Sequence, residues 1–280
     1  MIQSTTALKR KIKSVTSTRK ISNAMALVAT SKLQKQRKFM VNNNTFADTY
    51  SRLLDIVLSC KKEGEETNPF LTKKDINNPL HIVLTSNSGL CGSYNIEIVK
   101  YVKKNFKKED AIFAIGTYGA KALMEEDYCV VKQFHDMNDF VPSKVSELVS
   151  DVLLLYTRNE ISSLDITFTK YSNTLNYIPS TISLLPIENP HINVNKEMLL
   201  EPGREELLNQ LVPQYINSQI YACFLQAKTS EQVARISSME AAKNNADGLL
   251  DELSLQYNQA RQASITQEMN EISGAANYGG

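Results

Sequence analysis

The residues of this sequence best suited to chemistry lie in the segment 85–95, TSNSGLCGSYN. The segment follows a β-rich run and precedes a helical pattern, which is where a glycine-rich loop can hold a phosphate at a helix N-terminus. Its glycines are spaced Gly-x-x-Gly, however, and no Lys-Ser or Lys-Thr pair follows them, so a structural turn is favoured over a nucleotide site. Cys91 could act as a thiol nucleophile, but the segment holds no histidine to activate it.

The four cysteines are scattered, with no CxxC pair, so neither a zinc site nor a disulfide framework is expected and a reducing compartment is favoured. The formal net charge is +1, with 31 basic and 30 acidic residues, which gives no overall field for nucleic acid. No apolar run approaches the ~20 residues that a membrane-spanning helix needs. We therefore expect no cofactor, no metal and no catalytic residues.

Basic residues gather near the start of the chain. Between Lys9 and Lys38 there are ten basic residues and no acidic one. A solvated helix face is the ordinary explanation for such a run, a dock for an acidic protein surface comes second, and nucleic acid or anionic lipid comes third.

Two long stretches, at opposite ends of the chain, are predicted helices. The first covers about 5–60 without Pro or Gly, and the second covers about 205–272, interrupted only by Pro213 and Gly248. At 1.5 Å per residue they would be roughly 80 and 100 Å long, against about 30 Å for a small domain. Both carry apolar residues at helical spacing and many alanines, which predicts that they pack antiparallel as a coiled coil.

The middle of the chain alternates between strand and helix patterns. Strands are expected at about 80–84, 111–115, 129–131, 165–171 and 177–185, and helices at about 95–106, 120–126 and 143–156. This alternation predicts a mostly parallel open sheet, Rossmann-like, with a hairpin at its end, and Pro179 favours a sheet edge. The expected domains are an N-terminal coiled-coil helix (1–62), an α/β domain (78–192) and a C-terminal coiled-coil helix (204–280).

The C-terminal stretch is also rich in polar residues, beginning with Thr229, Ser230 and Glu231. Asn and Thr are mediocre helix formers, so their presence near alanine-rich turns favours directed hydrogen bonds. A helix surface that is simply wet is the alternative of similar weight.

Four segments carry a resemblance to a known family: KISNAMALVA (20–29), GLCGSYN (89–95), SEQVAR (230–235) and NQARQASITQE (258–268). In order and spacing, over nearly the whole chain, they strongly resemble the gamma subunit of the F-type ATP synthase. The last block is the most specific of the four.

The resemblance implies a non-catalytic central rotor stalk. Such a subunit couples its rotation to the nucleotide sites of a surrounding alpha/beta ring and to proton transport through the membrane sector. The implied partners are the alpha and beta subunits, the epsilon subunit and the c-subunit ring, with no nucleic acid. Membrane contact would run only through these partners, at the cytoplasmic side of a bacterial cell membrane.

The resemblance also implies roles for individual residues. Lys20, Met25, Arg235, Gln262 and Thr266 would face the catalytic subunits, and Met25 could instead pack in the helix seam. Three further residues would line the shaft near its tip or meet the ring's bearing: Lys9, Arg10 and Lys13. The motif of the lower domain comprises Gly89, Leu90, Cys91, Gly92 and Asn95.

Three alternatives stay open at this point. The chain has Asn87-Ser88 where the family carries an acidic-basic pair, which leaves room for a divergent F-type motor not coupled to proton flow. A coiled-coil scaffold with an α/β docking module is the second alternative. An enzyme built on the α/β insert is the third.

Overall fold

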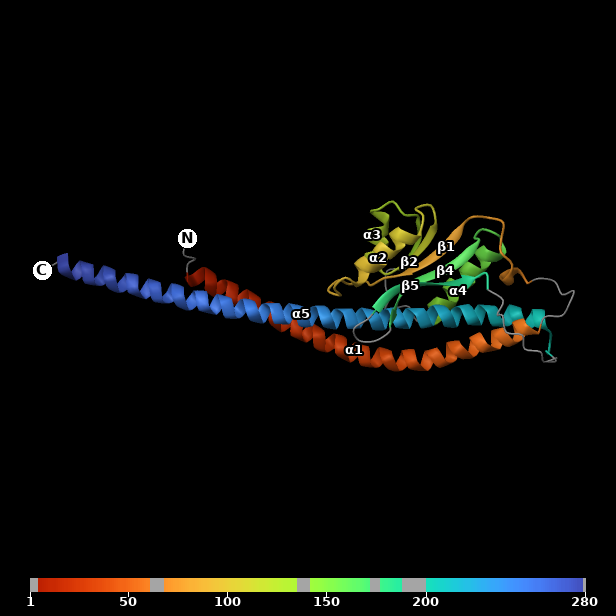
Figure 1. Ribbon diagram of the computed structural model, residues 1–280, viewed down its shortest axis with the longest axis horizontal. Coiled ribbons are helices and arrows are strands. Elements are labelled where there is room, and N and C mark those ends of the chain that lie inside the picture. The colour runs from red at the N-terminus through yellow and green to blue at the C-terminus, as the bar shows by residue number, and fades with distance from the viewer. Residues whose placement is uncertain (1–4, 61–67, 135–141, 172–176, 188–199, 279–280) are drawn as a thin grey trace. The chain divides into compact units, whose positions relative to one another are not determined.

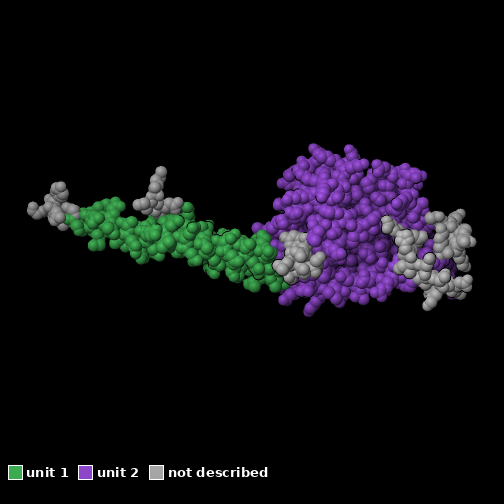
Figure 2. Space-filling model, in the orientation of Figure 1, with its two compact units in different colours: residues 1–30, 235–280 green, residues 31–234 purple. Residues whose placement is uncertain are grey.

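The structure is a computed structural model that describes residues 5–60, 68–134, 142–171, 177–187 and 200–278. The chain forms two compact units, one of residues Met1–Thr30 with Arg235–Gly280 (unit 1) and one of residues Ser31–Ala234 (unit 2) (Figure 2). The expected division into domains at 1–62, 78–192 and 204–280 stays a prediction. Residues 61–67, between the first long helix and the sheet in the sequence, lie outside the described residues.

Two long helices account for both ends of the chain, as predicted. Helix α1 (Thr5–Ser59) has 55 residues and helix α5 (Arg204–Tyr278) has 75 (Figure 1). Pro213 and Gly248 interrupt the sequence pattern without ending α5. Among the described residues, no helix is apolar over a stretch long enough to cross a membrane.

Unit 1 is an antiparallel pair made by the start of α1 and the end of α5. Leu8 is buried in one cluster with Leu253 and Ala260, whereas Arg19, further along α1, pairs with Asp247, which is earlier in α5. Residues later in α1 therefore contact residues earlier in α5, so the two helices run in opposite directions. This confirms the predicted antiparallel packing.

Unit 2 contains a five-stranded sheet of order β3-β2-β1-β4-β5. All neighbouring strands are parallel except β4 and β5, which form the expected antiparallel hairpin. The strands are β1 (Pro79–Leu84), β2 (Ala111–Ile115), β3 (Val130–Phe134), β4 (Ser163–Tyr171) and β5 (Tyr177–Leu185). The shorter helices of unit 2 are η1, a 3-10 helix (Pro69–Leu71), α2 (Tyr94–Asn105), α3 (Thr117–Met124) and α4 (Pro142–Thr157).

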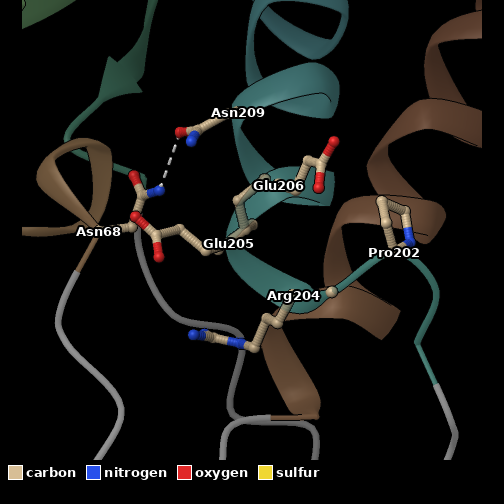
Figure 3. Close-up of a pocket in the computed structure, with 8 residues that line it drawn as sticks. Asn68, Pro202, Arg204, Glu205, Glu206 and Asn209 are labelled. Atoms are coloured by element: carbon tan, nitrogen blue, oxygen red, sulfur yellow. Dashed lines mark hydrogen bonds between the residues drawn. The ribbon is translucent and has the colours of Figure 1, made fainter.

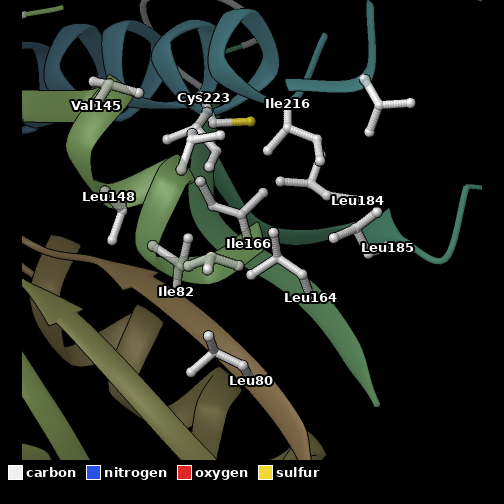
Figure 4. Packing of buried hydrophobic residues seen from close by; sticks show 14 of the residues in the cluster. Leu80, Ile82, Val145, Leu148, Leu164, Ile166, Leu184, Leu185, Ile216 and Cys223 are labelled. Atoms are coloured by element: carbon white, nitrogen blue, oxygen red, sulfur yellow. The ribbon is translucent and has the colours of Figure 1, made fainter. Parts of the chain in front are cut away.

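Helices cover both faces of this sheet. Because side chains alternate along a strand, Ile82 of β1 faces a large cluster with α4 and α5, and Val83 faces a smaller cluster with α2 and α3. Figure 4 shows the larger cluster, where strand residues such as Ile82 and Ile166 meet Val145 of α4 and Ile216 of α5. The sheet is the mostly parallel open sheet that the sequence predicted, with helices on its two faces.

Strand β3 and helix α3 have other bounds than those expected, whereas Pro179 lies where it was predicted. Strand β3 continues to Phe134, beyond the expected 129–131, because its residues pair with β2 as far as Ile115. Helix α3 begins at Thr117 rather than near 120, directly after Gly116, whose φ of 100° turns the chain out of the strand. Pro179 lies on β5, an edge strand, which confirms its predicted place.

Candidate functional site

The glycine motif of unit 2 forms the loop between β1 and α2. Leu90 and Gly92 both have positive φ, 62° and 58°, so the chain turns sharply twice before α2 begins at Tyr94. Glycine takes such angles at little cost, and Leu90 takes them with its side chain 56% exposed. The motif residues are thus a tight turn with one apolar side chain at its surface.

Asn95 closes the loop from inside. Its side-chain oxygen accepts a hydrogen bond from the Ser86 backbone N–H at 3.0 Å, and its amide donates to the Ser86 hydroxyl at 2.7 Å. The same amide lies 3.4 Å from the buried Cys91 sulfur. Asn95 and Cys91 therefore hold the turn together.

The neighbouring loop, which leads into α3, is fastened to the motif loop. The Asn87 side chain accepts from the Thr117 backbone N–H, and the Asn87 carbonyl accepts from the Thr117 hydroxyl, both at 3.0 Å. A Cβ on Gly119 would lie 2.3 Å from a carbon of Thr85, so only glycine allows this approach. The loop's polar groups are engaged within unit 2, which favours a structural turn over a phosphate cradle.

Helix α5 is joined to this region by two buried hydrogen bonds. The Tyr94 hydroxyl donates to the Ala227 carbonyl at 3.1 Å, and the Ser230 hydroxyl donates to the Thr169 carbonyl of β4 at 3.1 Å. Ser230 and its neighbour Glu231 are buried. The directed hydrogen bonds predicted for this polar stretch are confirmed for Ser230.

The basic residues carried over from the resemblance lie on the exposed surface of unit 1. Lys9, Arg10, Lys13 and Lys20 are exposed, and none forms an ion pair with another described residue. Met25 is 39% exposed and lies outside the buried seam cluster. These side chains are available to a partner, and their roles toward one stay predictions.

The remaining shaft residues belong to α5. Arg235 is half-buried, whereas Gln262 and Thr266 are exposed. The Thr266 hydroxyl donates to the Gln262 backbone carbonyl one turn earlier, at 3.0 Å, so this bond does not involve the Gln262 side chain. Gln262 and Thr266 belong to unit 1, and the motif loop belongs to unit 2.

Sequence reasoning missed two charged groupings. One is the ion pair between Arg19 and Asp247, on either side of the seam of unit 1. The other is His81, which lies 3.6 Å from the carboxylate of Asp110 and 3.4 Å from that of Asp165. The residues of each grouping are far apart in the sequence, so no local pattern could have revealed them.

A hollow of about 430 Å³ lies at the start of α5 (Figure 3). The Asn68 amide donates to the Asn209 side-chain oxygen at 3.3 Å, and Glu205 and Glu206 supply carboxylates. The Arg204 guanidinium donates to the Val57 carbonyl at 3.2 Å, so it ties α5 to α1. We assign this hollow to the junction of the helices. It is not an anion site, because the first turn of α5 carries Glu205 and Glu206, whose negative charges repel an anion.

Metal binding finds no support in the described part of the chain, where no group of three His, Cys, Asp or Glu side chains is placed to hold an ion. The fold and the site together define a coiled-coil protein with an α/β insert, whose surface exposes basic and apolar side chains.

Comparison with known proteins names the family. The model of the ATP synthase family matches residues 4–277. The ATP synthase gamma chain of Lachnoclostridium phytofermentans is 37% identical, over 96% of this chain and 97% of its own length. The ATP synthase gamma chain of Mycoplasma capricolum is 36% identical, over 96% of this chain and 97% of its own length. The chain therefore belongs to the ATP synthase gamma chain family.

Solved structures agree on the fold. The central stalk and c-ring structure of the Tetrahymena thermophila mitochondrial ATP synthase contains a chain that matches with a TM-score of 0.61 and 22% identity, over 79% of this chain and 99% of that one. A chain of the Euglena gracilis mitochondrial ATP synthase matches with a TM-score of 0.58 and 17% identity, over 91% of this chain and 95% of that one. The scaffold and divergent-motor alternatives are not favoured by the gamma-chain relatives of 36–37% identity.

Proposed function

We propose that this chain is the non-catalytic central rotor stalk of an F-type ATP synthase. Its rotation would couple the nucleotide sites of an alpha/beta ring to proton transport through the membrane sector. The observation that carries the proposal is the identity of 37% to a gamma chain over 96% of the sequence. The chain would sit at the membrane only through the complex, on the cytoplasmic side of a bacterial cell membrane, and would have no catalytic residues of its own.

The partners follow from the same proposal. The alpha and beta subunits would surround the helix pair, and the epsilon subunit and c-subunit ring would contact the α/β body. Exposed apolar side chains in unit 1, including Ile21 (59%), Leu27 (64%) and Val28 (56%), support a protein partner there. Exposed apolar side chains that are grouped on one surface commonly mark an interaction site, whereas single scattered ones do not.

Coupling requires that the helix pair contact the ring unequally. A rod without threefold symmetry meets each catalytic subunit of a threefold ring through different side chains. Each orientation then favours a different conformation at each nucleotide site, and nucleotide binding favours an orientation in return. Exposed ion pairs worth about 0–1 kcal/mol suit a surface whose contacts must break and form repeatedly.

We assign the ring contacts to Lys20, Met25, Arg235, Gln262 and Thr266. A contact near the tip or the ring's bearing is assigned to Lys9, Arg10 and Lys13. The exposure of all these residues except the half-buried Arg235 supports the assignment. The motif residues Gly89, Leu90, Cys91, Gly92 and Asn95 would shape the lower body, with Leu90 as its exposed apolar contact.

Co-purification tests the proposal. A tagged chain expressed in its own cell should bring down two homologous nucleotide-binding subunits, each in threefold excess. A complex with one partner in equal amount would support a scaffold instead. The isolated chain should show no heat of binding with ATP in calorimetry, and turnover by the isolated chain would support the enzyme alternative.

Substitutions in the assembled complex test the assigned residues. Arg235→Ala and Gln262→Ala should each lower the ATPase rate by about two- to tenfold without dissociating the complex, as expected for one lost hydrogen bond. Gln259→Ala is the matched control, because Gln259 is exposed three residues before Gln262 and is not assigned to the ring. Unchanged rates in both test variants would mean that these side chains serve the helix pair alone.

A further inference from the structure

A second hollow of unit 2, of about 280 Å³, lies between α1, the end of β5 and α5. We call it the Asp55 pocket. It is lined by Ser51, Leu54, Asp55, Ser183, Leu184, Pro186, Ile187 and Tyr215. Three of these residues, Leu54, Leu184 and Ile187, are buried apolar side chains, so the pocket has an apolar floor.

Asp55 gives this pocket its charge. Its carboxylate is half-buried, and it forms no ion pair with any residue that the structure describes. The Tyr215 hydroxyl is close enough to be affected by this charge. Burial raises the pKa of Tyr215, and the nearby Asp55 and Cys223 raise it further. A carboxylate beside buried apolar side chains loses part of its hydration. A bound cation stabilises it by replacing the lost hydrogen bonds to water.

The lining selects among possible occupants. An anion would be repelled by Asp55, and a divalent metal ion needs several more oxygen ligands than one carboxylate supplies. A lysine or arginine side chain satisfies both parts of the pocket, since its aliphatic stem packs on Leu54 and Ile187 while its charged end meets Asp55. The ring of Tyr215 offers such a cation a further contact.

We propose that the Asp55 pocket receives a lysine or arginine side chain from another subunit of the complex. The proposal rests on the proposed function, which supplies the partners. The proposed contact belongs to unit 2, whereas the residues assigned to the catalytic ring belong to unit 1. The pocket would fix the angular position of the partner on unit 2, because a charged side chain seated in a hollow resists sliding more than a flat apolar contact does.

The first test measures release of each subunit from the assembled complex. The complex is immobilised by a tag on this chain and diluted, and the release rate of every co-purifying subunit is followed by mass spectrometry. In Asp55→Asn one subunit should leave roughly tenfold faster or more, the loss expected for a hydrogen bond to a charged group. Raising the salt concentration should narrow the difference from wild type.

Asp48→Asn is the matched control, because Asp48 is an exposed carboxylate two turns earlier on α1 and does not line the pocket. It should leave every release rate unchanged. Equal release of all subunits from wild type and Asp55→Asn overturns the pocket proposal alone. A wild-type chain that brings down no nucleotide-binding subunits overturns the proposed function as well.

The second test is direct and needs no variant. An experimental structure of the wild-type complex should place a lysine or arginine of another subunit within about 3 Å of an Asp55 carboxylate oxygen. An empty pocket overturns the proposal, and so does a cation supplied by this same chain.

Discussion

The two units of the chain bury their side chains to very different extents. In the described residues of unit 2, two apolar clusters cover the two faces of the sheet, and large side chains such as Tyr156 and Phe168 are almost fully buried. Unit 1 has one small cluster built around Leu8, Leu253 and Ala260. Near its C-terminal end, Ile265, Met269 and Ile272 are 49%, 63% and 71% exposed.

The difference in apolar burial indicates that the two units obtain their stability from different sources. Unit 2 removes most of its apolar surface from water by its own folding, which is the main favourable term for a single domain. A pair of helices has only one seam to bury, so unit 1 leaves most of its apolar side chains to something outside the chain. We expect unit 2 to be stable alone and unit 1 to gain stability on assembly.

The largest expected effect breaks unit 2. Phe168→Ala should lower the free energy of unfolding by about 3–5 kcal/mol, because it empties a site that is 1% exposed. Denaturant titration of the isolated chain by circular dichroism measures it. Ile182→Ala on β5, where the side chain is 38% exposed, is the control and should change the value far less. Equal losses in both variants would mean that Phe168 is not packed as described.

The close approach beneath the motif loop gives the next effect. Gly119→Ala should lower the free energy of unfolding by about 1–3 kcal/mol, since its Cβ would lie 2.3–2.9 Å from three atoms of the Thr85 side chain. Gly89→Ala is the matched control, because a Cβ there meets nothing within 4 Å. Similar stability of the two variants would contradict the approach of α3 to Thr85.

A pH effect should separate unit 2 from unit 1, and it centres on His81. The imidazole is stacked on Phe106 at 3.9 Å and flanked by Asp110 and Asp165. Burial lowers its pKa from 6.5, while the two carboxylates act in the opposite sense. Folding therefore favours the neutral imidazole, and this contribution is present above pH 6.5 and lost as the pH falls through the lowered pKa.

The His81 imidazole should accordingly titrate below 6.5 in an NMR pH series, with its signal assigned by its absence in His81→Gln. The free energy of unfolding should fall more steeply below pH 6.5 in wild type than in His81→Gln. A titration midpoint above 6.5 would show that the carboxylates outweigh burial.

The smallest effect concerns the ion pair of unit 1. Arg19 and Asp247 have side chains that are 43% and 42% exposed, so solvent screens their attraction. A double-mutant cycle with Arg19→Gln and Asp247→Asn should give a coupling of about 0.2–1 kcal/mol that shrinks in high salt. Local hydrogen exchange at the seam is the measurement, and a coupling above about 2 kcal/mol would contradict a surface pair.

Much of the fold was readable from the sequence, because long helices and alternating strands carry a period. The absence of Pro and Gly over 5–60 predicted α1, and Pro179 predicted an edge strand. The extent of the third strand was misjudged because it depends on pairing with β2 residues that lie 18–19 positions earlier in the sequence.

The candidate site was predictable only in part. The turn around Gly92 followed from local sequence, whereas the bonds of Asn87 to Thr117 join loops that only the sheet order brings together. The Asp55 pocket likewise joins residues from three distant segments. Which side chains touch the ring depends on partner surfaces, so those assignments stay predictions.

Rotation of this chain during ATP hydrolysis tests the central claim most directly. The complex would be fixed to a surface through its ring, and a visible probe attached through the exposed Cys129 thiol. On addition of ATP the probe should turn in one direction, in three equal steps per revolution. A probe that stays still while the same complexes hydrolyse ATP would contradict the rotor account.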